Sequence, residues 1–370
     1  MANRARVTGH PPMGDELALT AGTVAALATA LSLTRFKIWW VRIWDFPRLQ
    51  VGILGLVPLL LWLATAPWGT WPRVLFTVAL AVAVTYQWAM VWRYTRLAPH
   101  EVQWSRDAAP DGRLSLVVSN VLQTNREADR LLGVLRDADA DLVLCVETDQ
   151  WWQVRLDALT DTHPHAVRCP LPNTYGMLLY SRLPLEETSV DFLVQRDIPS
   201  IQAKVRLRSG ARVWLHCVHP RPPAPGESDE SVERDAELLV VGKRVRDVRL
   251  PVVVCGDLND VAWSRTTRLF QKVSGLVDPR KGRGFYSTFH ARYPGFRYPL
   301  DHVFHSDDFR LVGLRRLPDV GSDHFPVYAA LSHEPEAAAE QQAPTADGGD
   351  EHEARKTIAE GSQGGTGGRT

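Results

Sequence analysis

Polar side chains that could support hydrolysis lie at the ends of several apolar runs. Asp257 and Asn259 follow the run 252–255, and a spacing of two residues places them on one side of an extended chain. A carboxylate there can take a proton from water, and a neighbouring amide can hold that water in line for attack. The alternative is a turn capped by the same two residues.

Two Asp-His pairs follow further along the chain. Asp301 lies in the otherwise apolar stretch 299–304, where an unpaired buried carboxylate would be costly. We therefore expect it to pair with the imidazolium of His324, which could stabilise a phosphoryl oxygen. His302 points to the opposite face of the strand, and we interpret it as structural.

Three further polar residues end apolar runs. Glu147 offers a carboxylate of the kind that binds a hard cation such as Mg²⁺. Asn120 ends another run, and His219 ends a third, where it could protonate a leaving oxygen or contact a phosphate. Each could equally belong to a simple loop. A zinc site on His216 and Cys217 is excluded, because they face opposite sides and no other Cys/His pair has ligand spacing.

Short apolar runs separated by turns begin at Arg113 and predict an α/β domain. Strands are predicted at 114–119, 141–146, 176–180, 188–194, 201–207, 213–218, 252–255, 300–304, 309–314 and 326–331, and helices at 126–138, 151–159, 231–248 and 264–274. Strands dominate and helices intervene, which favours two packed sheets with helices outside.

The four cysteines do not form an extracellular disulfide framework. Cys145, Cys217 and Cys255 lie in strand-like runs, and Cys169 is expected in a loop. We interpret them as buried free thiols.

The order and spacing of these motifs resemble the endonuclease/exonuclease/phosphatase superfamily. The resemblance covers about residues 113–331 and rests on Ser119-Asn120, Val146-Glu147, 176–182, His219-Pro220, 256–259, 300–302 and 322–324. It implies a four-layer α/β sandwich and a phosphoester hydrolase that uses Mg²⁺ or Mn²⁺. Within the superfamily, the chain resembles a bacterial subgroup with an N-terminal membrane anchor.

The resemblance also implies a metal and substrate shell. Glu147 would be the main metal ligand, with Asn120 and Asp323 beside it. We predict Asn120, Tyr175 and Arg283 as substrate contacts.

Catalytic roles follow from the same resemblance. Asp257 would activate or orient the attacking water, with Asn259 as its partner. His324 would face the phosphate and Asp301 would orient it. His219 occupies the position where DNases and sphingomyelinases carry His and abasic-site endonucleases carry Tyr, which favours the first two branches.

Three charge-free apolar stretches distinguish the N-terminal third from the rest of the chain. They cover residues 17–33, 51–66 and 74–92, and tryptophans crowd their ends. A spanning helix needs at least about 17 residues, and tryptophan favours the headgroup level. We predict a transmembrane region of two or three helices at 17–96. The alternatives are buried helices of a soluble domain, and a cleaved signal peptide at 17–33, although no small-residue cleavage site precedes Arg35.

Basic residues predict the orientation in a bacterial inner or plasma membrane. Those between the first two stretches (Arg35, Lys37, Arg42 and Arg48) and after the third (Arg93 and Arg96) would share one side. The positive-inside rule makes that side cytoplasmic, together with the catalytic domain. Arg4, Arg6 and Arg73 favour the opposite orientation.

The rest of the chain divides into an N-terminal tail (1–16), a linker (97–112), the catalytic domain (113–332) and a C-terminal tail (333–370). From residue 332 onward there are eight acidic and three basic residues, although the whole chain has a formal net charge of zero. The tail has almost no large apolar residues, so we expect it to be disordered.

These features leave three functions open. A nuclease would use basic residues and aromatic rings near the site, namely Arg280, Lys281, Arg283, Arg292, Arg297, Phe285, Tyr286 and Phe289, although an ordinary solvated loop has the same composition. A phosphodiesterase or phosphatase for phospholipid headgroups or inositol phosphates would work at the bilayer. A membrane scaffold would keep the fold without catalysis. The expected partners are the lipid bilayer and a phosphoester substrate, and no protein partner is evident.

Overall fold

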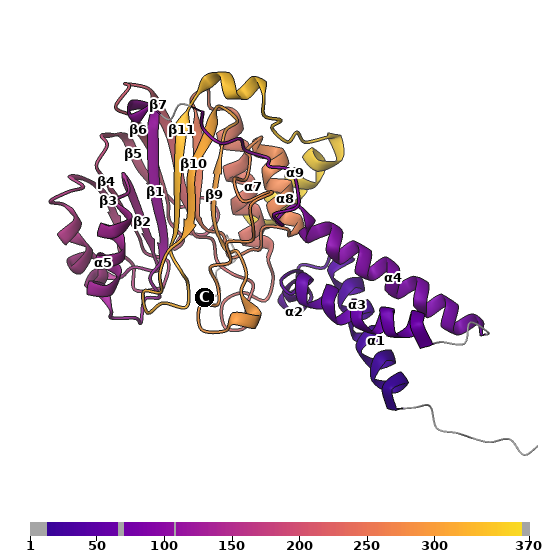
Figure 1. Ribbon diagram of the computed structural model, residues 1–370. Helices are drawn as coiled ribbons and strands as arrows, with labels where there is room; N and C mark the ends of the chain where they lie inside the picture. Colours follow the sequence, from indigo (N-terminus) through magenta and orange to yellow (C-terminus); the bar gives the residue numbers. More distant parts are fainter. Residues whose placement is uncertain (1–12, 66–69, 107–108, 365–370) are drawn as a thin grey trace, which may run out of the picture. The chain divides into compact units, whose positions relative to one another are not determined.

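The computed structural model describes residues 13–65, 70–106 and 109–364 (Figure 1). The chain forms two compact units, which are described separately. Residues 1–36 and 40–92 belong to a helical unit, and residues 37–39 and 93–370 belong to an α/β unit.

The helical unit contains the predicted apolar stretches. Its helices are α1 (Met13–Leu33), α2 (Trp39–Arg42), η1 (Ile43–Asp45), α3 (Arg48–Thr65) and α4 (Trp71–Trp92). Two segments, Glu16–Leu33 and Trp71–Trp92, are long and apolar enough to cross a membrane. A third crossing results if Trp39–Asp45 and Arg48–Ala64, which meet at 71°, are counted as one span. Crossing the membrane remains a prediction.

The α/β unit contains two mixed sheets. Their strands are β1 (Arg113–Asn120), β2 (Leu142–Val146), β3 (His165–Cys169), β4 (Met177–Ser181), β5 (Leu185–Asp191), β6 (Ser200–Arg206), β7 (Arg212–Val218), β8 (Val252–Asp257), β9 (Asp301–His305), β10 (Phe309–Arg316) and β11 (Val327–His333). The first sheet has the order β10-β11-β1-β2-β4-β3, and the second has the order β5-β6-β7-β8-β9.

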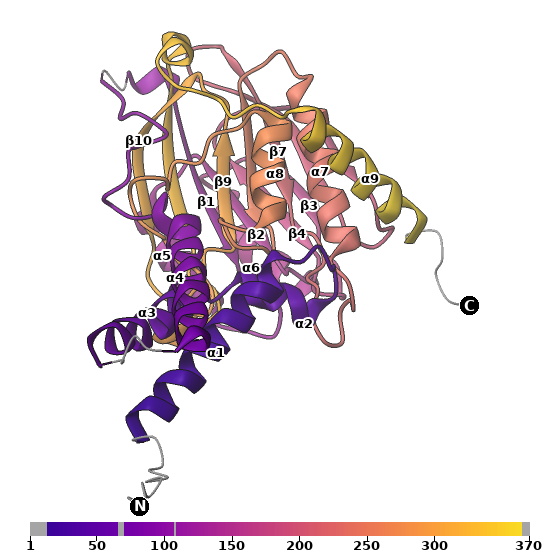
Figure 2. The same ribbon diagram turned by 90° about the vertical axis from the view of Figure 1, so that its right-hand side faces the viewer.

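Helices cover the outer faces of both sheets (Figure 1), and Figure 2 looks onto one of these helical layers. The elements that complete the unit are η2 (Pro110–Gly112), α5 (Ala128–Ala138), α6 (Gln150–Leu156), η3 (Asp157–Leu159), α7 (Val232–Arg246), α8 (Arg265–Ser274), η4 (Pro294–Phe296), η5 (Pro335–Ala339) and α9 (Gly348–Gly364). Side chains alternate along β7, so that Leu215 and Cys217 join the core between the sheets and Val218 packs under the outer helices. The predicted four-layer α/β sandwich is confirmed.

Strand directions bring the polar strand ends together. β1 is parallel to β2, with Asn120 opposite Val146, so Glu147 follows directly beside Asn120. In the second sheet β8 is antiparallel to β9, and Asp257 is opposite Asp301. Asn120, Glu147 and Asp257 therefore lie at the carboxyl ends of parallel strands. Asp301 instead lies at the start of the antiparallel strand β9.

The edge strands differ from the prediction. β3 was not predicted, because its five residues include His165 and Arg168 and give little apolar signal. Cys169 therefore ends a strand instead of lying in a loop. β5 begins three residues before the predicted segment 188–194, since its pattern is mostly polar and half-exposed. All four cysteines are free, and Cys145, Cys217 and Cys255 are buried as predicted.

The segments that flank the predicted domain are structured. In the predicted linker 97–112, Val102 joins the core between the sheets and Ser105 N donates to Leu311 O at 2.8 Å. The expectation of a disordered tail is wrong for residues 333–364, because α9 packs on α7 and α8 through Ala354 and several ion pairs. Composition could not reveal that oppositely charged partners lie on those helices. Residues 1–12 and 365–370, parts of the two predicted tails, lie outside the described residues.

Candidate active site

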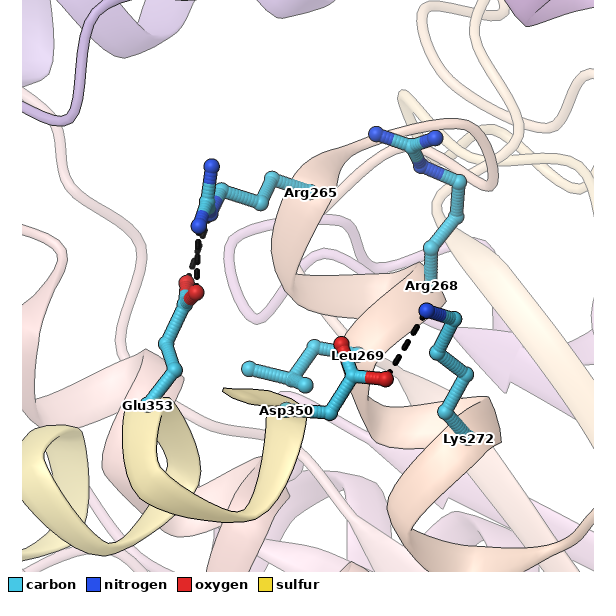
Figure 3. Close-up of a pocket in the computed structure, with 6 residues that line it drawn as sticks. All are labelled: Arg265, Arg268, Leu269, Lys272, Asp350 and Glu353. Carbon is cyan, nitrogen blue, oxygen red and sulfur yellow. Dashed lines mark hydrogen bonds and ion pairs between the residues drawn. The ribbon is translucent and has the colours of Figure 1, made fainter. Parts of the chain in front are cut away.

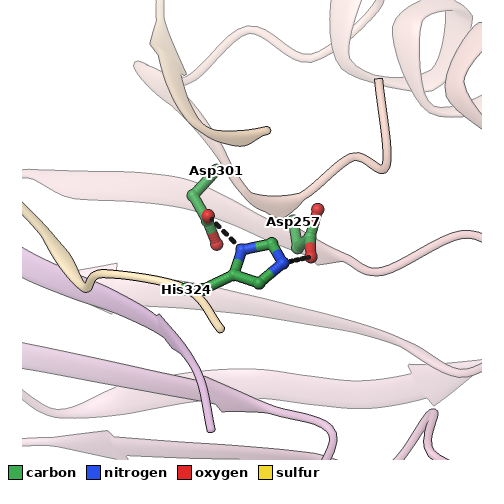
Figure 4. A group of neighbouring side chains, drawn as sticks. All are labelled: Asp257, Asp301 and His324. Carbon is green, nitrogen blue, oxygen red and sulfur yellow. Dashed lines mark hydrogen bonds and ion pairs between the residues drawn. The ribbon is translucent and has the colours of Figure 1, made fainter. Parts of the chain in front are cut away.

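A buried histidine lies between two buried aspartates (Figure 4). His324 Nδ1 is 2.7 Å from Asp301 Oδ2, and His324 Nε2 is 3.5 Å from Asp257 Oδ2. The pairing of Asp301 with His324 predicted from the sequence is therefore present. Because Asp301 engages one ring nitrogen, the ring has a fixed orientation and presents Nε2 towards Asp257.

A second group of side chains adjoins this histidine pair. Asn120 Nδ2 donates to Glu147 Oε1 at 2.7 Å and to Asp257 Oδ2 at 3.0 Å. Gln123 N donates to the other Glu147 oxygen at 3.3 Å. Asn120 thus links the end of β1 to carboxylates from both sheets.

Unusual backbone conformations occur at and beside the carboxylates Glu147 and Asp257. Glu147 and Asn259 have positive φ values of 61° and 51°, which non-glycine residues rarely adopt. Gly256 has a φ of 147°, and a Cβ atom there would lie 1.8 Å from Val218 O. Only glycine therefore allows β7 to approach β8 closely, immediately before Asp257.

His219 also lies near Asp257, and Tyr175 lies beside His219. His219 Nε2 is 4.0 Å from Asp257 Oδ2, and the rings of His219 and Tyr175 are 5.4 Å apart. Tyr175 Oη donates to Glu227 Oε2 at 2.6 Å, and the Arg221 guanidinium lies over the Tyr175 ring. His219 Nδ1 is buried without a hydrogen-bond partner among the described residues.

The pKa values of His324 and His219 are shifted in opposite directions. Burial lowers the pKa of His324, but the charges of Asp301 and Asp257 outweigh it and raise that pKa to about 10. Burial dominates at His219 and lowers its pKa to about 4. At neutral pH, His324 is an imidazolium and His219 is a neutral imidazole.

The carboxylates respond to the same buried environment. Burial raises the pKa of Glu147 to about 7, against the hydrogen bond from Asn120 and the charge of His324. Asp323 and Asp257 raise it further, which places Asp323 within electrostatic reach of Glu147. Burial also raises the pKa of Asp257, again opposed by His324. A divalent cation would relieve this crowding of negative charge.

Two predicted site residues have other contacts in the structure. The side chain of Asn259 donates to Pro220 O at 3.0 Å, and its backbone N donates to Asp257 Oδ1 at 2.9 Å. It therefore joins the ends of β7 and β8, and its role beside the attacking water stays a prediction. Arg283 is buried, bonds to the backbone carbonyls of Pro279 and Val102, and lies over Trp104. Its contacts are those of a structural residue, which corrects the expectation of a substrate contact.

Two further residues, Ser322 and Phe289, support His324. Ser322 Oγ donates to Asn120 O at 2.8 Å and accepts from His324 N at 3.0 Å. This one hydroxyl therefore joins the end of β1 to the segment that carries His324. The Phe289 ring lies 4.9 Å from the His324 ring. The Ser-Asp-His order was a usable signal for Ser322. Phe289 was predicted as a ring near the site that could stack on bases, and the structure places it against His324.

Comparison with known proteins defines the class. Residues 117–324, more than half of the chain, match the Endonuclease/Exonuclease/phosphatase family, and the chain belongs to this family. Enzymes of the family generally use divalent metals, and membership supports a phosphoester hydrolase. No curated protein matches the chain.

Several solved structures are similar to part of this chain. They include a functionally unknown conserved protein from Enterococcus faecalis V583 (15% identity, TM-score 0.50, 60% of this chain and 100% of that chain). An endonuclease/exonuclease/phosphatase from Beutenbergia cavernae DSM 12333 has 21% identity and a TM-score of 0.48 over 60% and 72% of the two chains. A humanized D. rerio TDP2 has 17% identity and a TM-score of 0.47 over 60% and 99%.

Proposed function

We propose that the chain is a membrane-anchored, divalent-metal-dependent phosphodiester hydrolase, with nucleic acid as its substrate. The observation that carries the proposal is the set of contacts around Asp257. His324 Nε2 and Asn120 Nδ2 both approach its Oδ2, and the same Asn120 amide also donates to Glu147. A structural core has no need for two buried carboxylates and a half-buried one near a single imidazolium, because each carries a desolvation cost.

The residues fit a cation bound by oxygen ligands. Glu147 and the Asn120 carbonyl offer hard oxygen ligands, with Asp323 near, which suits Mg²⁺ or Mn²⁺. Asp257, Asp301 and His324 could also hold a metal, since one atom from each lies within 4.8 Å of the others. We assign the metal to the Glu147 side, because the His324 proton already neutralises that second group.

In the proposed reaction, water attacks phosphorus and the bond to the leaving oxygen breaks. Asp257 accepts the proton of the water, a role for which its raised pKa is suited. The His324 imidazolium donates to a phosphoryl oxygen. The Asn120 amide, whose two N–H groups donate to Glu147 and Asp257, holds these carboxylates in place. His219, neutral at pH 7, orients the substrate by hydrogen bonding rather than protonating the leaving group. The metal, when bound, supplies positive charge for the phosphate and the leaving oxygen.

A substrate panel on wild type and Asp257→Ala tests the proposal. Plasmid DNA, single-stranded oligonucleotides, phospholipid vesicles and inositol phosphates are each incubated with Mg²⁺ or Mn²⁺, and Asp247→Asn serves as a matched exposed control. We expect cleavage of nucleic acid by wild type and the control, and none by Asp257→Ala. Full activity of Asp257→Ala would refute the assignment.

A lipid substrate is the second candidate, and the apolar helices favour it. Because an anchor at the bilayer surface would hold the site near headgroups, a phosphodiesterase or phosphatase for phospholipid headgroups or inositol phosphates suits such a chain. Phosphate release from vesicles without DNA cleavage would select this function. Inactivity on every substrate, together with an absence of metal binding, would indicate a non-catalytic membrane scaffold.

A further inference from the structure

The C-terminal helix α9 covers a basic surface on the outer helices of the α/β unit. This surface, the α7–α8 basic face, consists of Lys243 and Arg246 of α7 and Arg265, Arg268 and Lys272 of α8. α9 lies beyond residue 324, where the family match ends, so this arrangement is not part of the matched domain.

Acidic side chains of α9 pair with the basic face. Asp350 is 2.9 Å from Lys272, and Glu353 bonds Arg265 (Figure 3). Glu351 bonds Arg246. The helix thus occupies the surface as an anionic ligand would.

The cover is held by ion pairs and by a narrow strip of small side chains. Ala354 joins the small cluster with Leu239, Leu269 and Val273, and Ile358 packs there only partly. Thr357 and Gly361 of α9 are also buried. The ion pairs are partly exposed, and such pairs are weak and are screened by salt. Two glycines at the start of α9 make it a poor helix by itself. A competing anion could therefore displace it.

The segment before α9 is fixed at Gln341, and a cavity lies beside the ion pairs. Gln341 anchors the preceding segment, because its side chain accepts from Gln103 N at 2.7 Å and donates to Phe309 O at 2.8 Å. Between α8 and α9 lies a cavity of about 180 Å³, lined by Arg265, Arg268, Lys272, Leu269, Asp350 and Glu353 (Figure 3). Three cationic and two anionic side chains leave this opening with net positive charge.

We propose that the α7–α8 basic face is a docking surface for anionic lipid headgroups and that α9 is its removable cover. The charge complementarity with α9 indicates an anionic partner. The apolar helices of the same chain would keep a bilayer at high effective concentration, which favours lipid over a soluble polyanion. The inference uses the membrane anchoring proposed above, but not the hydrolase activity.

Hydrogen exchange of the full chain in nanodiscs tests the proposal. The exchange of the 348–364 amides is compared between phosphatidylcholine nanodiscs and nanodiscs that also contain phosphatidylserine. We expect exchange to become about tenfold faster with phosphatidylserine, as typical coupling between two ligands predicts, while β8 amides stay unchanged. High salt should weaken the difference.

Variants make the test specific. Asp350→Asn/Glu353→Gln weakens the cover without altering the basic face, so α9 should exchange faster in phosphatidylcholine alone. Arg244→Gln, which removes a basic α7 residue that pairs with Asp191 instead, should respond to phosphatidylserine like wild type. Equal exchange of wild type in both lipids would overturn the proposal. Acceleration by an added oligonucleotide but not by phosphatidylserine would overturn the lipid assignment. A chain that does not enter nanodiscs would contradict the anchoring itself, and nuclease or phosphatase activity is scored separately.

Discussion

At the residue scale, the positive charge of His324 depends on Asp301. The variant Asp301→Asn should therefore lower the pKa of His324. The variant keeps the size of the side chain but removes the largest influence that raises the His324 pKa. Because His324 is protonated below its pKa, a lower pKa leaves less imidazolium at alkaline pH. We expect activity to fall about 10²- to 10⁴-fold at pH 8 and to recover in part at acidic pH. A pH profile of kcat that only scales down, without changing shape, would contradict this role.

A buried glutamate outside the site should make stability depend on pH. Neither carboxylate oxygen of Glu237 in α7 has a hydrogen-bond partner among the described residues, and burial raises its pKa from 4.5 to about 8. The unfolded chain loses this proton near pH 4.5 and the folded chain near pH 8, so stability falls as pH rises between them. The loss amounts to roughly 4 kcal/mol.

Glu237→Gln should therefore stabilise the α/β unit at pH 8 and abolish most of this pH dependence. Thermal and denaturant unfolding at pH 5 and pH 8 provide the measurement, with half-buried Glu233→Gln on the same helix as the control. A stability difference between pH 5 and pH 8 that is equal in wild type and Glu237→Gln would show that another group is responsible.

At the element scale, a buried ionic cluster joins the helices of the helical unit. Asp45 pairs with Arg42 at 3.2 Å and with Arg48 at 2.5 Å, and Arg48 also donates to Ser32 and Gln87. Asp45→Asn leaves two buried guanidinium groups without their carboxylate. We expect a loss of about 3–5 kcal/mol in unfolding from detergent micelles, whereas the exposed control Arg35→Gln should be neutral. Unchanged unfolding of Asp45→Asn would mean that apolar packing alone holds these helices.

The approach of β7 and β8 depends on Gly256. Gly256→Ala would place Cβ 1.8 Å from Val218 O, in a backbone conformation that alanine rarely adopts. We expect more than about 3 kcal/mol of destabilisation, measured by denaturant unfolding. Gly210→Ala is the matched control, because Gly210 also has positive φ but nothing lies within 4 Å of its Cβ position. If both variants cost the same, φ rather than the close approach is decisive.

At the scale of the whole molecule, metal binding should stabilise the fold through Glu147. A ligand at about 100 times its Kd adds about 2.7 kcal/mol to the free energy of unfolding. We expect Mg²⁺ or Mn²⁺ to raise the melting temperature of wild type, and to do so more strongly above pH 7, because the ion competes with the Glu147 proton. Glu147→Gln should lose this shift while Glu127→Gln on the exposed surface keeps it. A full metal-induced shift in Glu147→Gln would place the ion elsewhere.

The sequence by itself determined the alternation of strands and helices, the apolar N-terminal stretches and the polar strand ends. These features are local: each depends on periodicity or on the few residues around a turn. The pairing of Asp301 with His324 also followed, because a carboxylate in an apolar strand requires a partner.

Only the tertiary structure decided how Asn120 reaches Asp257, why Arg283 is structural, and where the acidic tail lies. Asn120 and Asp257 are 137 residues apart and come from different sheets. Arg283 has a partner in Val102, and α9 has partners on α7 and α8, at sequence separations that periodicity cannot detect. A side chain's burial and charge environment depend on the packing of distant elements, and these set the different pKa values of His219 and His324.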